Sequence, residues 1–190
     1  PLPNRLPIVL LAARLLVDKG VREFVHAAEL VNKTKIRARF VLVGEIDKLN
    51  PASIQEQELS TWKENGLVEL WGYRHDMENV LSSATIVVLP SYREGFPKIL
   101  VEAASCGRVI ITTDVPGCRD AIEKDVTGLL VPVRNARTLA KAVSELLNDP
   151  SLCKKMGIAG RERAERLFDI KKIVEEHTDI YKQLSHNNKV

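Results

Sequence analysis

Two cations and two carboxylates stand at spacings that could hold a ligand carrying both phosphate and hydroxyl groups. Arg14 and Lys19 follow an apolar run that ends at Ala13. A guanidinium can hold a phosphate through two hydrogen bonds, and a lysine ammonium acts as a movable point charge. Glu94 and Glu102 lie on either side of a predicted helix start, where carboxylates could accept hydrogen bonds from vicinal hydroxyls. Each pair is also compatible with solvated surface charge.

The segment that follows Glu94 has further features of a ligand-binding loop. Gly95 allows the backbone to approach a ligand closely. Pro97 is expected in the first turn of a helix over 97–106, and Gly107 stands just past the end of that helix. Helices commonly have Pro near the start and Gly just after the end. The start of the helix would present free N–H groups to an anion.

Short apolar runs alternate with helical patterns along most of the chain, and this alternation predicts the scaffold. It indicates parallel βαβ units, and therefore an α/β fold with a doubly wound, Rossmann-like parallel sheet and flanking helices. Ligands of such sheets bind at the carboxyl ends of the strands. Strands are predicted over 8–11, 40–43, 67–71, 86–89, 109–111 and 128–131, and helices over 21–31, 52–64, 77–83, 97–106 and 138–147.

Two further helices without strands are predicted at the C-terminal end. The helix over 151–166 is rich in Lys and Arg, which indicates either a solvated face or a patch for anionic lipid head groups. The helix after it carries an apolar stripe from Ile170 to Leu184, and such a stripe needs a surface to pack against. The predicted division is a ligand-binding domain over 1–168, a last helix over 169–185 and a polar tail over 186–190.

Composition excludes several classes of protein. The 190 residues carry a formal net charge of +3 and are 45% hydrophobic, so the chain is neither disordered nor strongly basic. No apolar run is long enough to span a membrane. The three cysteines form no CxxC pair, which favours reduced thiols and a cytoplasmic location.

Several common binding motifs are absent from the sequence. No GxGxxG follows the first predicted strand, and no GxxxxGK[ST] occurs anywhere in the chain, so neither a dinucleotide fingerprint nor a P-loop is indicated. No Asp-x-Asp occurs, and the four histidines show no metal-ligand spacing. We therefore expect no metal site and no bound cofactor.

The run from Glu94 to Glu102 resembles the Glu-x7-Glu motif of retaining GT-B glycosyltransferases, particularly those of glycosyltransferase family four. The resemblance extends over nearly the whole chain. Each matching landmark is weak alone, and together they are specific. The other landmarks lie at 13–20, 41–44, 71–73, 102–107 and 127–132.

The resemblance implies a role for each matching residue. Arg14 and Lys19 would hold the donor diphosphate and neutralise charge as the nucleoside diphosphate departs, without a metal. Glu94 would contact hydroxyls of the transferred sugar, and Glu102 would hold the ribose hydroxyls. Tyr73 and Arg74 would lie along the nucleobase, and Gly44 would leave room for the ligand. The remaining implied contacts, near the sugar or the phosphates, are Gly95, Phe96, Pro97, Lys98 and Ile99.

Three departures from the family pattern occur. Ala13 replaces the glycine that usually precedes the arginine, and Ile46 stands where a second glycine often follows Gly44. Both departures bear on how closely a phosphate could approach the backbone. Arg108 stands where proline is frequent, and the segment 108–120 resembles bacterial members that build lipid-linked surface polysaccharides or glycan precursors.

The resemblance implies the donor-binding half of a retaining glycosyltransferase, with a UDP-hexose or UDP-N-acetylhexosamine donor and a glycan or lipid-linked acceptor. Two alternatives remain: a sugar-nucleotide epimerase of the same fold, and a non-catalytic nucleotide-sugar-binding module. The expected partners are the donor, the acceptor and an N-terminal acceptor domain outside this chain, and no nucleic acid. We expect a cytoplasmic protein, with a peripheral place on the inner membrane face as the alternative.

The length bears on this interpretation, because transfer in such enzymes takes place between two domains. A chain of 190 residues that begins with Pro1 is expected to lack the first domain, and so to bind donor without transferring sugar. The resemblance suggests that the last helix crosses back to that domain. We therefore expect the helix to be mobile or covered by a neighbouring copy.

Overall fold

Six parallel strands form a single sheet in the computed structural model, which describes residues 6–187. The strands lie in the order β3-β2-β1-β4-β5-β6, and the paired neighbours all run parallel. This is the order of a doubly wound, Rossmann-like sheet, so the predicted fold class is confirmed. The strands are β1 (Ile8–Ala12), β2 (Arg39–Val43), β3 (Glu69–Leu70), β4 (Ile86–Leu89), β5 (Val109–Thr113) and β6 (Gly128–Val131).

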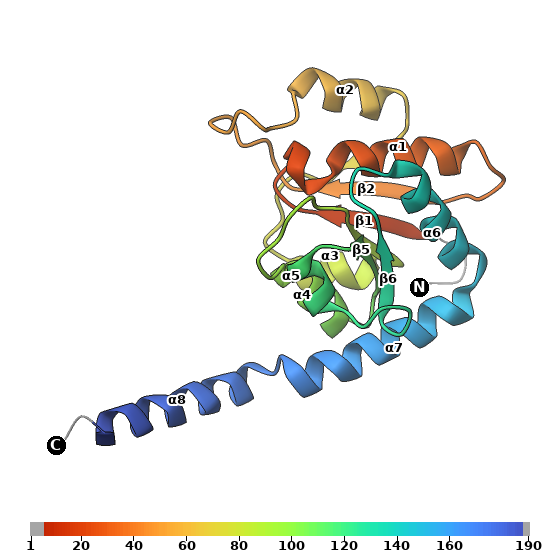
Figure 1. Cartoon of the computed structure of the whole chain (residues 1–190). Coiled ribbons are helices and arrows are strands. Elements are labelled where there is room, and N and C mark those ends of the chain that lie inside the picture. Colours follow the sequence, from red (N-terminus) through yellow and green to blue (C-terminus); the bar gives the residue numbers. More distant parts are fainter. Residues whose placement is uncertain (1–5, 188–190) are drawn as a thin grey trace.

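Helices cover both faces of this sheet, and the last of them extends beyond it (Figure 1). Those on one face, including α1 and α6, share one hydrophobic core, and α3, α4 and α5 share a second core on the other face. The helices are the 3-10 turn η1 (Val17–Lys19), α1 (Val21–Asn32), α2 (Glu56–Glu64), α3 (Met77–Ser83), α4 (Lys98–Ser105), α5 (Pro116–Ala121), α6 (Ala136–Asn148), α7 (Pro150–Leu167) and α8 (Ile170–Asn187).

The continuous apolar runs become strands because the sheet is covered on both faces. Every residue of β1 is buried, and successive side chains of a strand point to opposite faces. Val9 and Leu11 therefore enter one core, while Ile8, Leu10 and Ala12 enter the other. This double burial explains why the strands of a parallel sheet show no alternation of polar and apolar residues.

α2 and β3 differ most from their predicted bounds, and the short helical elements η1 and α5 were not predicted. α2 begins at Glu56 rather than near residue 52, because Asn50 and Ser53 bind nearby backbone groups and compete with the helix. A capping box between Gln55 and Glu58 then starts α2. β3 has only two paired residues. The short helix α5 was not predicted, because Pro-Gly at 116–117 is also a turn signal.

Basic residues of α7 are partly used inside the protein. Arg163 donates to the carbonyl oxygens of Asp120 and Ala121 at 3.0 and 3.2 Å, and Arg161 donates to that of Ser105. Ser105 and Ala121 are the last residues of α4 and α5, where a helix favours positive charge. These two arginines therefore join α7 to the ends of two other helices.

α8 extends away from the sheet (Figure 1). The described side chains of its apolar stripe are exposed. No surface within residues 6–187 covers that stripe, and its mobility or coverage by another copy stays a prediction. The described stripe residues are exposed to 68% at Ile170, 54% at Val174, 51% at Ile180, 72% at Tyr181 and 57% at Leu184.

The predicted boundaries near the C-terminus can be compared with the helix bounds. α7 ends at Leu167, and α8 begins at Ile170 and reaches Asn187, so the first two residues of the predicted tail continue the helix. Residues 188–190 of that tail, like Pro1, lie outside the described residues. In the described part of the chain, no helix combines the length and the apolarity that crossing a membrane requires.

Candidate functional site

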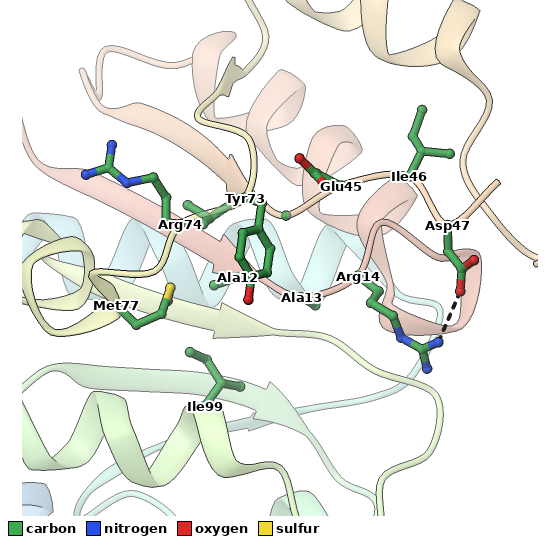
Figure 2. Close-up of a pocket in the computed structure, with 12 residues that line it drawn as sticks. Ala12, Ala13, Arg14, Glu45, Ile46, Asp47, Tyr73, Arg74, Met77 and Ile99 are labelled. Carbon is green, nitrogen blue, oxygen red and sulfur yellow. Dashed lines mark hydrogen bonds and ion pairs between the residues drawn. The ribbon is translucent and has the colours of Figure 1, made fainter.

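A hollow of about 410 Å³ opens where β1 and β2 end. It adjoins the point where the order of strands reverses between β1 and β4, which is the usual ligand position in this kind of sheet. Figure 2 shows the residues that line it, which come from four separate segments of the chain. The sequence-predicted site residues that line it are Arg14, Gly44, Tyr73, Arg74 and Ile99.

Arg14 stands at the rim of this hollow, directly after β1. Its side chain is 63% exposed, and Nη1 lies 3.2 Å from Oδ2 of Asp47 (Figure 2). Such an exposed pair contributes little to folding, so the guanidinium is free to turn toward an anion. Asp47 was not singled out from the sequence, and it competes with any anion for Arg14.

Gly44 lies at the floor of the hollow with a φ of +137°. A Cβ atom at this position would stand 2.0 Å from the carbonyl oxygen of Ala13. No other residue fits between the ends of β1 and β2 at this distance. The glycine is therefore required by the protein's own backbone, independently of the room for a ligand that the sequence suggested.

Tyr73 and Arg74 come from the segment after β3. The exposed ring of Tyr73 packs edge-on against His75, with 4.8 Å between centroids. Arg74 donates two hydrogen bonds of 2.7 Å to the carboxylate of Asp76. The Arg74 guanidinium lowers the pKa of Asp76 to about 2. Both predicted residues line the hollow, and each contacts a neighbouring side chain.

Lys19 and Glu94 form an ion pair outside the lining of the hollow. Lys19 Nζ lies 2.7 Å from Glu94 Oε1, and the two side chains are only 20% and 13% exposed. The buried hydroxyl of Ser91 donates to the same carboxylate oxygen at 2.7 Å. The structure therefore joins one predicted cation to one predicted carboxylate. Ser91 is a partner that sequence reasoning missed, although it stands just after β4.

Close backbone packing sets the position of this pair. Gly20 has a φ of +72°, and a Cβ there would lie 2.2 Å from the carbonyl oxygen of Pro90. Lys19 is thereby held against the end of β4. The hydroxyl of Thr113 on β5 binds the carbonyl oxygen of Ser91, so the segment leading to Glu94 is anchored from a second strand.

The segment after Glu94 leads into α4 with one difference from prediction. Pro97 is the N-cap of α4, with a ψ of 103°, and not a residue of its first turn. Its extended conformation follows from its place before the first helical residue. Gly95 packs against Gly117 of α5, where a Cβ would lie 2.0 Å from the Gly95 carbonyl oxygen. Phe96 is half exposed, and its ring contacts that of Phe168 at a tilt.

Glu102 does not line the main hollow. It lies on α4 beside a smaller hollow of about 270 Å³, and Met77 borders both hollows. Its carboxylate pairs with Lys98, with 3.3 Å between Nζ and Oε1. The structure thus places Glu102 and Lys98 next to the site, while Ile99 on the same helix faces the main hollow (Figure 2).

The sequence of this chain matches a known family profile over residues 6–149. The profile is that of the glycosyl transferases group 1. The chain belongs to this family. The matched range contains all of the predicted site residues, from Arg14 to Glu102.

Two bacterial relatives of this group 1 glycosyl transferase show how much of the chain is shared. The N,N'-diacetylbacillosaminyl-diphospho-undecaprenol alpha-1,3-N-acetylgalactosaminyltransferase of Campylobacter jejuni is 36% identical over 185 residues, which cover 97% of this chain and 46% of the relative. A capsular polysaccharide biosynthesis glycosyltransferase of Staphylococcus aureus is 28% identical over 168 residues, covering 88% and 44%. The chain spans about half the length of the curated relatives it matches.

Solved structures agree with this assignment. Sucrose-phosphate synthase from Thermosynechococcus elongatus superposes with a TM-score of 0.85 at 31% identity, over 98% of this chain and 47% of that one. Anabaena Alr3699/HepE in complex with UDP gives a TM-score of 0.83 at 21% identity, over 94% and 49%. The group 1 glycosyl transferase chain therefore has the fold of one half of a GT-B glycosyltransferase.

The arrangement has the chemical groups to hold an anion beside hydroxyl groups. Arg14 and Arg74 supply donors at the main hollow, and Glu102 supplies an acceptor at the smaller one. Glu94, paired with Lys19, supplies a further acceptor outside both linings. Among residues 6–187, no three side chains of the His, Cys, Asp or Glu type gather as metal ligands would. Asp47 and Ser91 complete the set, and their only sequence signal is their place just after a strand.

Proposed function

We propose that this group 1 glycosyl transferase chain binds the nucleotide-sugar donor of a retaining glycosyltransferase. The observation that carries the proposal is the Lys19–Glu94 ion pair, with Arg14 nearby on the same strand end. Two cations that could bind a diphosphate, Arg14 and Lys19, thus follow β1. A carboxylate that could bind a sugar, Glu94, follows the neighbouring strand β4. The pair is ordered before any ligand arrives, which lowers the entropy cost of binding.

The proposed mechanism relies on fixed charges. Arg14 binds the diphosphate once it turns from Asp47, and Lys19 supplies a second positive charge as the glycosidic bond breaks. Charge that develops on the departing diphosphate is stabilised by these cations and by the N–H groups at the start of α4. The Glu94 carboxylate accepts hydrogen bonds from hydroxyls of the transferred sugar. This set of groups needs no metal ion and no other cofactor.

The nucleoside is proposed to occupy the hollow of Figure 2. Tyr73 and Arg74 lie along its wall and would contact the base, while Gly44 forms the floor. Glu102, on the other side of Met77, would accept hydrogen bonds from the ribose hydroxyls once its ion pair with Lys98 is broken. A UDP-linked hexose or N-acetylhexosamine is the proposed donor, and the support is that Anabaena Alr3699/HepE, which has the same fold, forms a complex with UDP.

The acceptor is proposed to be a glycan or a lipid-linked glycan. The support is the name of the Campylobacter jejuni relative, which specifies a diphospho-undecaprenol acceptor. The chain spans only about half of that relative, so we propose that a second domain supplies the acceptor site. A cytoplasmic protein working at the inner membrane face fits this acceptor.

Calorimetry on the 190-residue chain tests the donor assignment. UDP-glucose, UDP-N-acetylgalactosamine, GDP-mannose and ADP-glucose are compared at millimolar concentration, with and without EDTA. We expect a UDP-sugar to bind most tightly and EDTA to have no effect. Absence of binding by all four would contradict the donor site, and loss of binding in EDTA would contradict the metal-free mechanism.

Products of the full-length protein separate transfer from its alternatives. A glycosyltransferase transfers the sugar to an undecaprenyl-diphosphate-linked glycan, and NMR of the new linkage shows whether the anomeric configuration is retained. Inversion of configuration would refute the retaining mechanism. Conversion of one UDP-sugar into its epimer without an acceptor would indicate an epimerase, and donor binding without turnover would indicate a binding module.

A further inference from the structure

The rings of Phe96 and Phe168 contact each other at a tilt, although one residue follows β4 and the other directly follows α7. Their ring centroids are 5.4 Å apart and the ring planes are inclined by 60°, an arrangement in which aromatic rings attract each other. α8 begins just beyond Phe168, at Ile170. The contact therefore joins the 94–97 loop (Glu94 to Pro97) to the junction between the two C-terminal helices.

Phe168 is itself held in place by Arg163 on the same helix. The guanidinium carbon lies 5.2 Å from the ring centroid, within the range of a cation–π contact. The same guanidinium binds the carbonyl oxygens of Asp120 and Ala121 at the end of α5. The ring of Phe168 is thus backed by a group that is anchored to another helix.

The 94–97 loop is fixed on its inner side and open on its outer side. Glu94 is bonded to Lys19 and Ser91, Gly95 packs against α5, and Pro97 is buried. Phe96 is 49% exposed. The ring contact with Phe168 therefore restrains the part of the loop that these inner contacts leave free.

We propose that Phe168 is a positioning residue for the 94–97 loop and acts on the donor sugar through Phe96. The inference rests on the proposed function, in which the loop contacts the sugar while the nucleoside occupies the hollow. A ring that keeps the loop in one conformation pre-organises Glu94 and the following N–H groups. Its removal then weakens contacts to the sugar and leaves those to the nucleotide unchanged.

The test compares UDP with UDP-N-acetylgalactosamine and UDP-glucose, using the 190-residue chain and calorimetry. The measured quantity is the ratio of UDP-sugar affinity to UDP affinity. Phe168→Ala should lower this ratio about fivefold, as expected for loss of one aromatic pair, while UDP affinity stays within about twofold. Phe168→Tyr keeps the ring and should keep the ratio.

Two further variants make the comparison specific. Leu167→Ala shortens the neighbouring exposed side chain at the same helix end and should leave the ratio unchanged. Phe96→Ala truncates a half-exposed side chain, so it should fold and lower the ratio as Phe168→Ala does. The double variant should lose no more than either single variant, because both remove the same contact.

Hydrogen exchange gives a readout without ligand. The amides of residues 94–96 and 98 should exchange faster in Phe168→Ala than in the unchanged chain, while those of β1 and β4 stay protected. Unchanged exchange in this segment would overturn the proposal. Leu167→Ala should exchange like the unchanged chain.

The binding outcomes separate this inference from the proposed function. An unchanged ratio in Phe168→Ala and Phe96→Ala refutes the inference and leaves donor binding intact. An equal loss of UDP and UDP-sugar affinity indicates a general structural role and also refutes it. A chain that binds UDP and both UDP-sugars equally well has no sugar contact for the loop to position. Absence of binding of UDP and of both UDP-sugars would refute the proposed function, and the inference with it.

Discussion

Lys19 Nζ lies 2.7 Å from Glu94 Oε1, although the two residues are 75 positions apart in the sequence. Both side chains are mostly shielded from water, so their attraction is screened less than that of a surface pair. Lys48 and Glu56 form such a surface pair, with side chains that are 79% and 72% exposed. The two pairs offer a matched comparison of buried and exposed charge.

Lys19→Ala should lower the free energy of unfolding by about 2 kcal/mol, because it leaves the Glu94 carboxylate shielded without its cation. Lys48→Ala, the matched control, should change it by less than about 0.5 kcal/mol. Urea denaturation at neutral pH measures both. Equal effects of the two substitutions would show that shielding does not strengthen the Lys19–Glu94 pair.

Arg14→Ala should reduce UDP affinity about tenfold through loss of charge-assisted hydrogen bonds. The exposed side chain should add little to stability, so the unfolding free energy should stay within about 0.5 kcal/mol. Asp47→Asn removes the competing carboxylate and should strengthen UDP binding. Lys33→Ala, at the far end of α1, is the control for net charge. If Lys33→Ala and Arg14→Ala weaken UDP equally, the phosphate site lies elsewhere.

Gly20→Ala should destabilise the protein by about 3 kcal/mol, since it combines a left-handed φ with a clash against Pro90. Gly66→Ala is the control, because Gly66 has a φ of +66° and open space around its Cβ position. It should cost only about 1 kcal/mol. Thermal and urea unfolding of both variants would measure the difference in stability. Similar losses of stability in the two variants would rule out a contribution from the clash with Pro90.

Asp76 should titrate with a pKa of about 2, because the Arg74 guanidinium favours the charged carboxylate. A lowered pKa in the folded state means that the pair's contribution to stability is present above pH 4 and is lost as the pH falls toward 2. NMR of the carboxyl carbon measures the pKa directly. In Arg74→Ala the pKa should return toward 3.8, and an unshifted value would contradict the role of Arg74.

Much of the scaffold could be predicted from local patterns. Strands that are buried on both faces, such as β1 and β4, show as unbroken apolar runs, and α3 shows as a short amphipathic pattern. The late start of α2 and the helix α5 could not be predicted in this way. Side-chain hydrogen bonds from Asn50 and Ser53 decided the first, and packing around Pro116 and Gly117 decided the second.

The candidate site could be predicted as a set of residues but not as a set of partners. Arg14, Tyr73 and Arg74 meet at one hollow because the carboxyl ends of neighbouring parallel strands lie together. The sequence offered no sign that Asp47 binds Arg14 or that Ser91 binds Glu94. These contacts depend on the lengths and paths of loops, which local patterns do not specify.

The α/β class, the order of most elements and the charged residues at the strand ends could be read from the amino-acid sequence alone. These follow from periodicity and residue type, which act over a few positions of the chain. Packing of the whole chain brings Lys19 to Glu94, places Glu102 beside a second hollow and brings Phe96 against Phe168. Such contacts join residues far apart in the chain, so they arise only when the sheet and its helices pack together.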